Sequence, residues 1–187
     1  MDEIILRALE PEDLDVLYSI ENDIELWNVG YTTVPYSRYL LHDYIATSTC
    51  DIYADKQLRL LAETKNGGDV VGIVDITDYN PQHNRAELGL VVRRQYRNMG
   101  YGSVIVKQMI DYAHQVIHLH QLYIVVDIDN TTSIELFKNC GFQVSNYLED
   151  WLYDGEKYRK AVLLTFFCNF SANRLEFSKK LRTFAPA

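Results

Sequence analysis

The sequence predicts an α/β fold built on one mixed sheet, mostly antiparallel, with a single parallel strand pair. In the first half, three apolar strands are separated by the turn sequences Asn66–Asp69 and Asn80–Asn84, which is typical of an antiparallel meander. The third of these strands is followed by a helix and a short, wholly apolar strand. That order indicates a right-handed crossover to a parallel, buried neighbour.

The first half is expected to contain four strands and two helices. Pro11, flanked by acidic residues, favours the start of the first helix, whose apolar stripe continues to Ile20. Ser37 can cap a second helix that continues to about Ser48. The strands are expected at Ile4–Arg7, Leu58–Ala62, Val70–Tyr79 and Ala86–Val92.

The second half is expected to begin with a helix after Gly102 that carries apolar residues on one face. Asp154-Gly155 is a strong hairpin signal between two long strands. The remaining elements are a strand at Leu122–Val126, a helix at Thr131–Lys138 and hairpin strands at Phe142–Tyr153 and Tyr158–Phe167. We expect residues 1–170 to form one domain, followed by a polar C-terminal extension over residues 171–187.

Composition narrows the classes of function. The chain has 187 residues and a net charge of −8, which disfavours nucleic acid as a partner and suits a cationic substrate such as an amine, although the charge also serves solubility. No secretory signal or membrane-spanning run is visible, so a cytoplasmic protein without membrane partner is expected. The three cysteines are widely spaced, and His114 and His118 lack further ligands nearby, so we predict no metal site.

The most informative segment is a glycine-containing turn between an apolar strand and a helix, Arg97-Asn98-Met99-Gly100-Tyr101-Gly102. Backbone N–H groups at a helix N-terminus, together with the helix dipole, form a cradle for anions. Gly100 and Gly102 would let the backbone approach a pyrophosphate closely. The segment lacks the third glycine of a dinucleotide fingerprint and the Gly-Lys-Ser/Thr end of a Walker loop. Alone, it could also be a simple turn.

With its surroundings, the segment resembles the phosphate loop of the GNAT N-acetyltransferase superfamily, Arg/Gln-x-x-Gly-x-Gly/Ala, matched here by Arg97, Gly100 and Gly102. A second similarity is an Asn after the next strand and a helix ending in Gly-Phe, here Asn130 to Phe142. Residues 4–168 are covered by the resemblance. Within the superfamily, the chain looks similar to bacterial spermidine N-acetyltransferases and to ribosomal-protein alanine N-acetyltransferases.

The resemblance implies a cofactor site. The parallel strand pair should splay open, with helices on both faces of the sheet, and acetyl-CoA should lie in the wedge as co-substrate. The pantetheine of acetyl-CoA would pair with backbone groups of Leu90, Val91 and Val92. Its pyrophosphate would bind to the loop formed by Arg97, Asn98, Met99, Gly100, Tyr101 and Gly102. Asn130 and Phe137 would complete the cofactor site.

The family also implies a general base, and Glu87 on the strand before the loop is the matching carboxylate. An ion pair of Glu87 with Arg85 or Arg159 is the alternative reading. Phe137 departs from the family pattern, which places a tyrosine there as acid for the leaving thiolate. Cys140 is a poor substitute and is better interpreted as a small buried apolar residue.

The substrate entrance also departs from the spermidine enzymes, because the early loop and second helix lack their run of acids. The candidate substrate residues are Glu25, Trp27, Tyr31, Tyr36 and Asp75, although the aromatics can equally be lid packing. The resulting function is acetyl transfer to a primary amine, either a polyamine-like molecule or a protein N-terminus. A non-catalytic acyl-CoA-binding module is the alternative. The exposed edge of the last hairpin suggests a homodimer or higher homo-oligomer.

Overall fold

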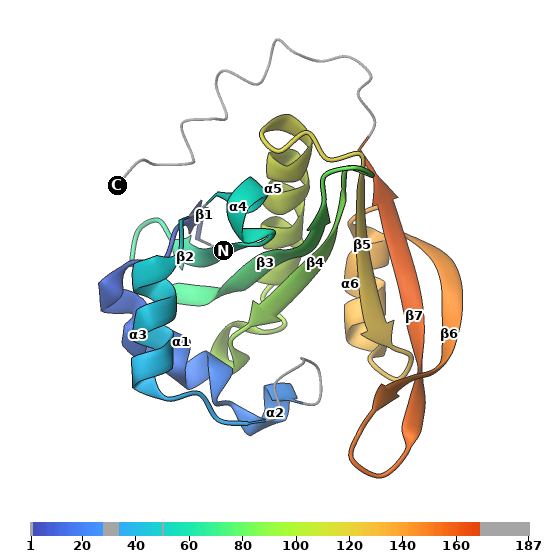
Figure 1. The fold of residues 1–187 in the computed structure, drawn as a ribbon, viewed down its shortest axis with the longest axis horizontal. Coiled ribbons are helices and arrows are strands. Elements are labelled where there is room, and N and C mark those ends of the chain that lie inside the picture. Colours follow the sequence, from blue (N-terminus) through green and yellow to red (C-terminus); the bar gives the residue numbers. More distant parts are fainter. Residues whose placement is uncertain (1, 28–33, 50, 169–187) are drawn as a thin grey trace.

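A seven-stranded sheet in the order β1-β2-β3-β4-β5-β7-β6 organises the protein (Figure 1). The computed structural model describes residues 2–27, 34–49 and 51–168. Only the β4–β5 pair of this sheet is parallel, which confirms the predicted fold class. The strands are β1 (Ile4–Arg7), β2 (Leu58–Thr64), β3 (Val70–Asn80), β4 (Arg85–Val92), β5 (Gln121–Asp127), β6 (Gln143–Tyr153) and β7 (Tyr158–Phe167).

The helices begin where their local sequences provide caps. Ser37 accepts a hydrogen bond from the Leu40 N–H at the start of α3, as predicted. Two single-turn helices, α2 and α4, were not predicted, because four residues are too short to show an apolar stripe. The helical elements of the described residues are η1 (Pro11–Asp13), α1 (Leu14–Glu21), α2 (Ile24–Trp27), α3 (Arg38–Thr47), α4 (Ile52–Asp55), η2 (Arg94–Tyr96), α5 (Tyr101–Gln115) and α6 (Thr131–Asn139).

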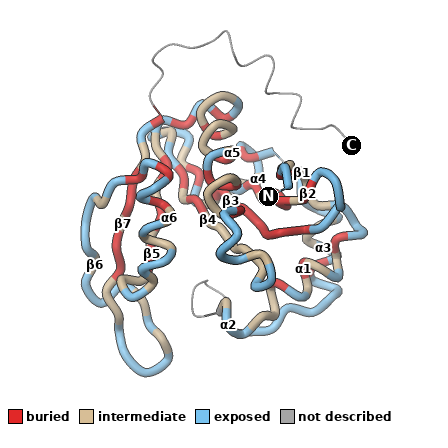
Figure 2. The backbone as a smooth tube through the Cα atoms, turned by 180° about the vertical axis from the view of Figure 1, so that it is seen from behind, coloured by how far each residue is buried: buried red, intermediate tan, exposed pale blue. Residues whose placement is uncertain are grey.

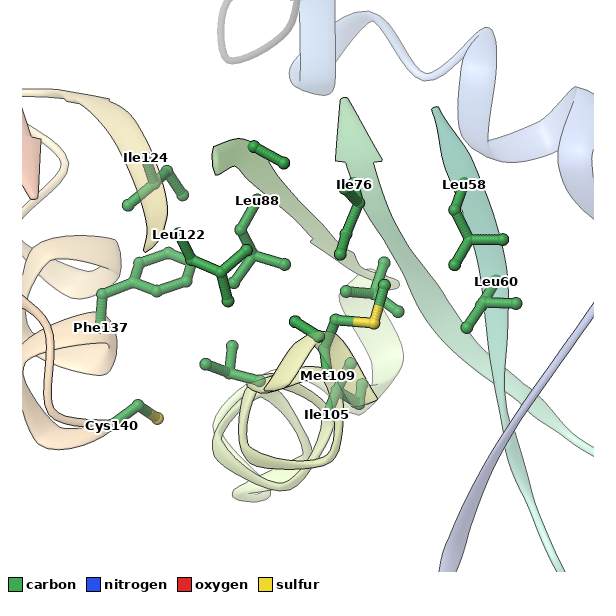
Figure 3. Packing of buried hydrophobic residues seen from close by; sticks show 14 of the residues in the cluster. Leu58, Leu60, Ile76, Leu88, Ile105, Met109, Leu122, Ile124, Phe137 and Cys140 are labelled. Atoms are coloured by element: carbon green, nitrogen blue, oxygen red, sulfur yellow. The ribbon is translucent and has the colours of Figure 1, made fainter. Parts of the chain in front are cut away.

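Two apolar clusters fix the sheet between layers of helices. The larger cluster joins β3, β4 and β5 to α5 and α6, with Met109 and Phe137 pointing toward the strands (Figure 3). The smaller cluster, which includes Leu17, Leu41 and Ile73, packs α1 and α3 against the other face. Seen from behind, buried segments follow the strands, whereas β6 at the edge is largely exposed (Figure 2). Helices therefore cover both faces, as expected.

The parallel pair separates soon after it forms. β4 and β5 share only three register pairs, and the last of these joins Glu87 to Tyr123. Beyond it, β4 continues to Val92 beside β3, and β5 continues to Asp127 beside β7. Figure 1 shows the two strands diverging from this point. The predicted splay is confirmed, and it opens next to Glu87.

The last two strands form the predicted hairpin. Asp154 and Gly155 lie in its turn, where Gly155 has a φ of 99° and the Asp154 carboxylate accepts hydrogen bonds from the N–H groups of Glu156 and Lys157. The predicted extension, residues 171–187, lies outside the described residues. Within the described ranges, no helix is long and apolar enough to cross a membrane.

Candidate active site

The turn between β4 and α5 begins with a hydrogen bond from the Arg97 N–H to the Arg94 carbonyl, at 3.3 Å. Asn98 and Gly100 both adopt left-handed backbone conformations, with φ of 60° and 85°. Such residues turn successive N–H groups toward one side, which creates an anion-binding concavity. α5 then begins at Tyr101. Its N-cap residue, Gly100, has no side chain that could accept a hydrogen bond from the first N–H groups of the helix. Because the first N–H groups of a helix have no acceptor within it, this end is free to bind an anion.

Each of the three arginines near the turn has a protein partner. Arg97 donates through Nε to the Val92 carbonyl at 3.0 Å and so closes the turn onto the end of β4. Arg93 donates to the Val70 carbonyl, and Arg94 pairs with Glu25 of α2 at 3.0 Å. The turn is therefore held to β4, β3 and α2, and Glu25, a predicted substrate residue, contacts the cofactor turn.

The side chains of the predicted cofactor turn differ in exposure. Met99 is exposed, whereas Tyr101 is buried and packs edge-on against Tyr96. Tyr101 can therefore meet a phosphate through its N–H group, while its ring belongs to the core. A Cβ added to Gly102 would lie 3.2 Å from Leu136 Cδ2, so α5 and α6 meet closely at this residue.

The edge of β4 beyond Glu87 provides the expected binding strip. Leu90, Val91 and Val92 are all half-buried, and none of them has a register partner on β5. Backbone groups along an unpaired strand edge can hydrogen-bond an extended ligand as an added strand would. The neighbouring apolar side chains of Leu90 and Leu136 suit the aliphatic part of a pantetheine chain.

Two predicted cofactor residues on α6 have visible structural roles. The Asn130 side chain caps the helix by accepting a hydrogen bond from the Ser133 N–H at 3.1 Å. Phe137 is only 2% exposed and packs edge-to-face on Phe142 at a ring-centroid distance of 5.3 Å. Nearby, burial raises the pKa of the Cys140 thiol, and its Sγ lies 3.9 Å from the Ser103 carbonyl oxygen. Cys140 is thus a buried apolar residue, as the sequence indicated.

Glu87 is half-buried at the point where the parallel strands separate. Burial and the negative charge of Asp78 raise the pKa of Glu87, while a hydrogen bond from the Val125 backbone N–H opposes them. Among the described residues Glu87 has no salt-bridge partner, and Arg159 instead pairs with Asp127 and Asp129. The alternative reading of Glu87 as an ion-pair residue with Arg159 therefore finds no support in the structure.

Two residues near Glu87 were missed by the sequence reading. Asp78 lies in an irregularity of β3, and Tyr123 is the register partner of Glu87 on β5. The Tyr123 hydroxyl donates a hydrogen bond to the Asp78 carboxylate at 2.5 Å. In the sequence, Tyr123 carries the one polar side-chain group of an otherwise apolar run. That hydroxyl was a signal that could have drawn attention to Tyr123.

The predicted substrate residues that the structure describes have partners within the protein. Asp75 accepts two hydrogen bonds from Arg59, at 2.8 and 2.9 Å, and Arg59 also pairs with Glu21 of α1. The Tyr36 backbone is held by two hydrogen bonds with the Asn22 side chain. Tyr31 and the Trp27 side chain lie outside the described residues. The described residues thus place Glu25 beside the cofactor turn and Asp75 in an ion-pair network.

Comparisons with known proteins agree with this geometry. A family model described as an acetyltransferase (GNAT) domain matches residues 3–143. The chain is 26% identical to the spermidine N(1)-acetyltransferase of Escherichia coli K12 over 166 residues, which cover 87% of this chain and 84% of the relative. It is 25% identical over 147 residues to an L-amino acid N-acetyltransferase of the same organism, covering 77% of this chain and 85% of that one.

Solved structures share the fold. A spermidine N-acetyltransferase from Vibrio cholerae in complex with CoA and spermine superposes with a TM-score of 0.78 at 21% identity, covering 88% of this chain and 95% of that one. A dodecameric structure of the V. cholerae enzyme gives a TM-score of 0.76 at 22% identity, covering 92% of this chain and 98% of that chain. Since the family model spans well over half of the sequence, the chain belongs to the GNAT acetyltransferase family and is an acetyl-CoA-dependent N-acetyltransferase.

Proposed function

We propose that the protein acetylates a primary amine of the polyamine class and that Glu87 accepts the proton of that amine. The observation that carries this proposal is the position of Glu87, a half-buried carboxylate at the last pair before β4 and β5 separate. A carboxylate with a raised pKa is a better base at neutral pH than an ordinary one. Glu87 has this property because burial and the charge of Asp78 favour its protonated form.

The reaction assigns one task to each part of the site. The amides of residues 97–102 bind the pyrophosphate of acetyl-CoA, and the edge of β4 at Leu90–Val92 binds its pantetheine arm. Glu87 accepts a proton from the amine, whose pKa of about 10.4 keeps it mostly protonated at neutral pH. The amine nitrogen then bonds to the acetyl carbon while the carbon–sulfur bond breaks, and the second proton of that nitrogen passes to the departing thiolate or to solvent. A thiolate with a pKa of about 8.5 can leave without an acid, so Phe137 does not prevent turnover.

The polyamine class is supported by charge and by the relatives. The net charge of −8 favours a cationic substrate over an anionic one. Two curated relatives that each cover more than four fifths of this chain, from E. coli and V. cholerae, are named spermidine N(1)-acetyltransferases. Glu25 pairs with Arg94 in the structure, and we propose that its carboxylate exchanges this partner for the distal nitrogen of such a substrate. A protein N-terminus remains the other substrate class to be tested.

The test is CoA release with a panel of spermidine, spermine, short diamines, free amino acids and peptides with an N-terminal alanine. We expect turnover with the polyamines and little with the peptides. Glu87→Gln should abolish most of that turnover while leaving acetyl-CoA affinity unchanged in calorimetry. Glu149→Gln makes the same chemical change at an exposed position on β6 and should behave as the wild type. Peptides as the best substrates would contradict the polyamine assignment.

We also propose that copies of the chain associate through the last hairpin. β6 is an edge strand whose exposed aromatic residues include Tyr147 and Trp151, exposed by 54% and 57%. Exposed aromatic groups on a free strand edge favour association. The V. cholerae relative is dodecameric in one of its structures, which supports the same expectation for this chain.

A further inference from the structure

Asp78 and Tyr123 meet beside Glu87 because β3 carries a bulge. β3 and β4 pair at Thr77 with Glu87 and again at Asn80 with Arg85, so two residues of β3 oppose one residue of β4. Regular alternation would turn Asp78 toward the face covered by α5. Instead, Tyr79 is buried in that core and Asp78 is exposed. Bulges of this kind re-aim side chains and are frequent next to active sites.

The backbone of Asp78 is itself unusual. Its φ of 49° lies in the left-handed region, which asparagine and aspartate tolerate better than most residues. Residues held in such conformations persist where the surrounding structure determines them, and they cluster at functional sites. Here the backbone lies in the bulge, and the hydrogen bond from the Tyr123 hydroxyl holds the Asp78 carboxylate.

This hydrogen bond crosses β4 at one defined place. Tyr123 lies on β5, Asp78 on β3, and the β4 residue between them in register with Tyr123 is Glu87. Burial, the hydrogen bond to Asp78 and the charges of Glu87 and Asp78 raise the pKa of Tyr123, while Arg85 lowers it. The net effect keeps the hydroxyl protonated, so Tyr123 acts as a donor to Asp78 and not as a base.

We propose that Tyr123 and Asp78 form a clamp across β4 that holds a second negative charge beside Glu87 and makes Glu87 a stronger base. Asp78 is a positioning residue in this scheme, since it acts through Glu87 and transfers no proton. The groups that act on Glu87 are Asp78 from β3 and the Val125 N–H from β5, whereas Asp78, Glu87 and Arg85 act on Tyr123. The inference rests on the proposed role of Glu87.

The clamp predicts the direction in which the pKa of Glu87 changes when the charge of Asp78 is removed. A nearby negative charge favours the protonated form of a carboxyl group, so its removal lowers the pKa of Glu87. In Asp78→Asn, the acidic limb of the kcat/KM profile should therefore move to lower pH. The plateau should fall roughly two- to ten-fold, because a weaker base accelerates proton transfer less. Asp78→Glu keeps the charge and should restore the limb toward its wild-type position.

Tyr123, the other residue of the clamp, provides an independent variant. Tyr123→Phe removes the hydroxyl that holds Asp78, so the limb should move in the same direction by a smaller amount. The double variant Asp78→Asn/Tyr123→Phe should match Asp78→Asn alone, since no charge is left to be positioned. The matched control is Asp150→Asn, which makes the same change at a φ of 48° in an irregular part of β6. This control should leave the profile unchanged.

The deciding experiment titrates Glu87 directly, by NMR of protein labelled with ¹³C at glutamate carboxyl groups and assigned by comparison with Glu87→Gln. A lower Glu87 pKa in Asp78→Asn together with a moved kinetic limb supports the clamp. An unchanged Glu87 pKa in Asp78→Asn overturns the clamp, even if Glu87→Gln is inactive and the base assignment stands. A lower Glu87 pKa with full activity of Glu87→Gln contradicts the proposed function and, with it, the catalytic purpose of the clamp.

Discussion

Phe137 occupies the helix position where the family offers a tyrosine, and the structure places its ring in the core against Phe142. A phenyl ring cannot give a proton to the departing thiolate. Cys140 does not replace it, because burial raises the pKa of its thiol and its Sγ lies near a backbone carbonyl. We therefore expect the missing acid to affect the departure of the thiolate and not the attack of the amine.

Phe137→Tyr tests this account of the missing acid. The added hydroxyl should raise turnover or leave it unchanged, because it can protonate the sulfur but is not required for attack. Acetyl-CoA affinity, measured by calorimetry, should not change. A large loss of turnover with an unchanged melting temperature would show that the phenyl ring itself serves another purpose, such as packing against the acyl group.

Asp75 was predicted to contact substrate, but its two hydrogen bonds from Arg59 suggest a structural role. Asp75→Asn leaves the half-buried guanidinium with Glu21 alone. We expect a loss of about 1–3 kcal/mol in the free energy of unfolding, measured in urea, with turnover per folded molecule nearly unchanged. An unaltered free energy of unfolding together with a raised KM for the amine would support the prediction that Asp75 contacts the substrate.

We propose that the turn before α5 binds the cofactor through its backbone N–H groups. A test must therefore separate backbone strain from the loss of anion binding. Gly100 has a φ of 85°, so any side chain there strains the turn as well as obstructing an anion. Gly155 has a φ of 99° and nothing within 4 Å of an added Cβ, which makes it a control for strain alone. Gly100→Val and Gly155→Val should each lose at least about 1 kcal/mol of stability.

Only Gly100→Val should also lose acetyl-CoA affinity, by an order of magnitude or more, because of the two glycines only Gly100 borders the amides that we propose to bind the pyrophosphate. Calorimetry of acetyl-CoA binding on both variants, at a temperature where both are folded, measures the difference. Equal affinities in the two variants would show that the cofactor binds elsewhere.

Sequence periodicity predicted long elements well and short ones poorly. The apolar stripe after Gly102 marked α5, and the turn residues at Asp154-Gly155 marked the hairpin, because both signals are local. The single-turn helices α2 and α4 gave no periodic signal. The bulge that exposes Asp78 was also not visible, because it depends on pairing between β3 and β4 rather than on residue type.

The arrangement of the sheet explains why the site itself was only partly predictable. Resemblance to the family indicated Glu87, the cofactor turn and the splay, because the motifs of the family cover these segments. Asp78 and Tyr123 are 45 positions apart and meet only because β3 and β5 both flank β4. The Arg59 pairs with Asp75 and Glu21 likewise join β2, β3 and α1, so these ion pairs could not be predicted from the sequence.

The proposed association of copies of the chain through β6 can be tested by measuring the molar mass in solution. Tyr147→Ser/Trp151→Ser should lower the molar mass measured by light scattering, because it removes two exposed aromatic groups from the edge strand. The control is Tyr39→Ser on α3, an aromatic residue that is at least as exposed. A molar mass that is unchanged in the double variant, or that falls equally in Tyr39→Ser, would place the interface elsewhere.

The central claim is that Glu87 removes the proton of the amine, and the pH dependence of Glu87→Gln turnover tests it most directly. Glutamine keeps the shape of the side chain and cannot accept the proton. At neutral pH we expect turnover to fall roughly 10²–10⁴-fold relative to the wild type. Near pH 10 the amine loses its proton without help, so the ratio between wild type and variant should shrink. A ratio close to one at neutral pH, or one that stays constant as the pH rises, would contradict the assignment of Glu87 as the base.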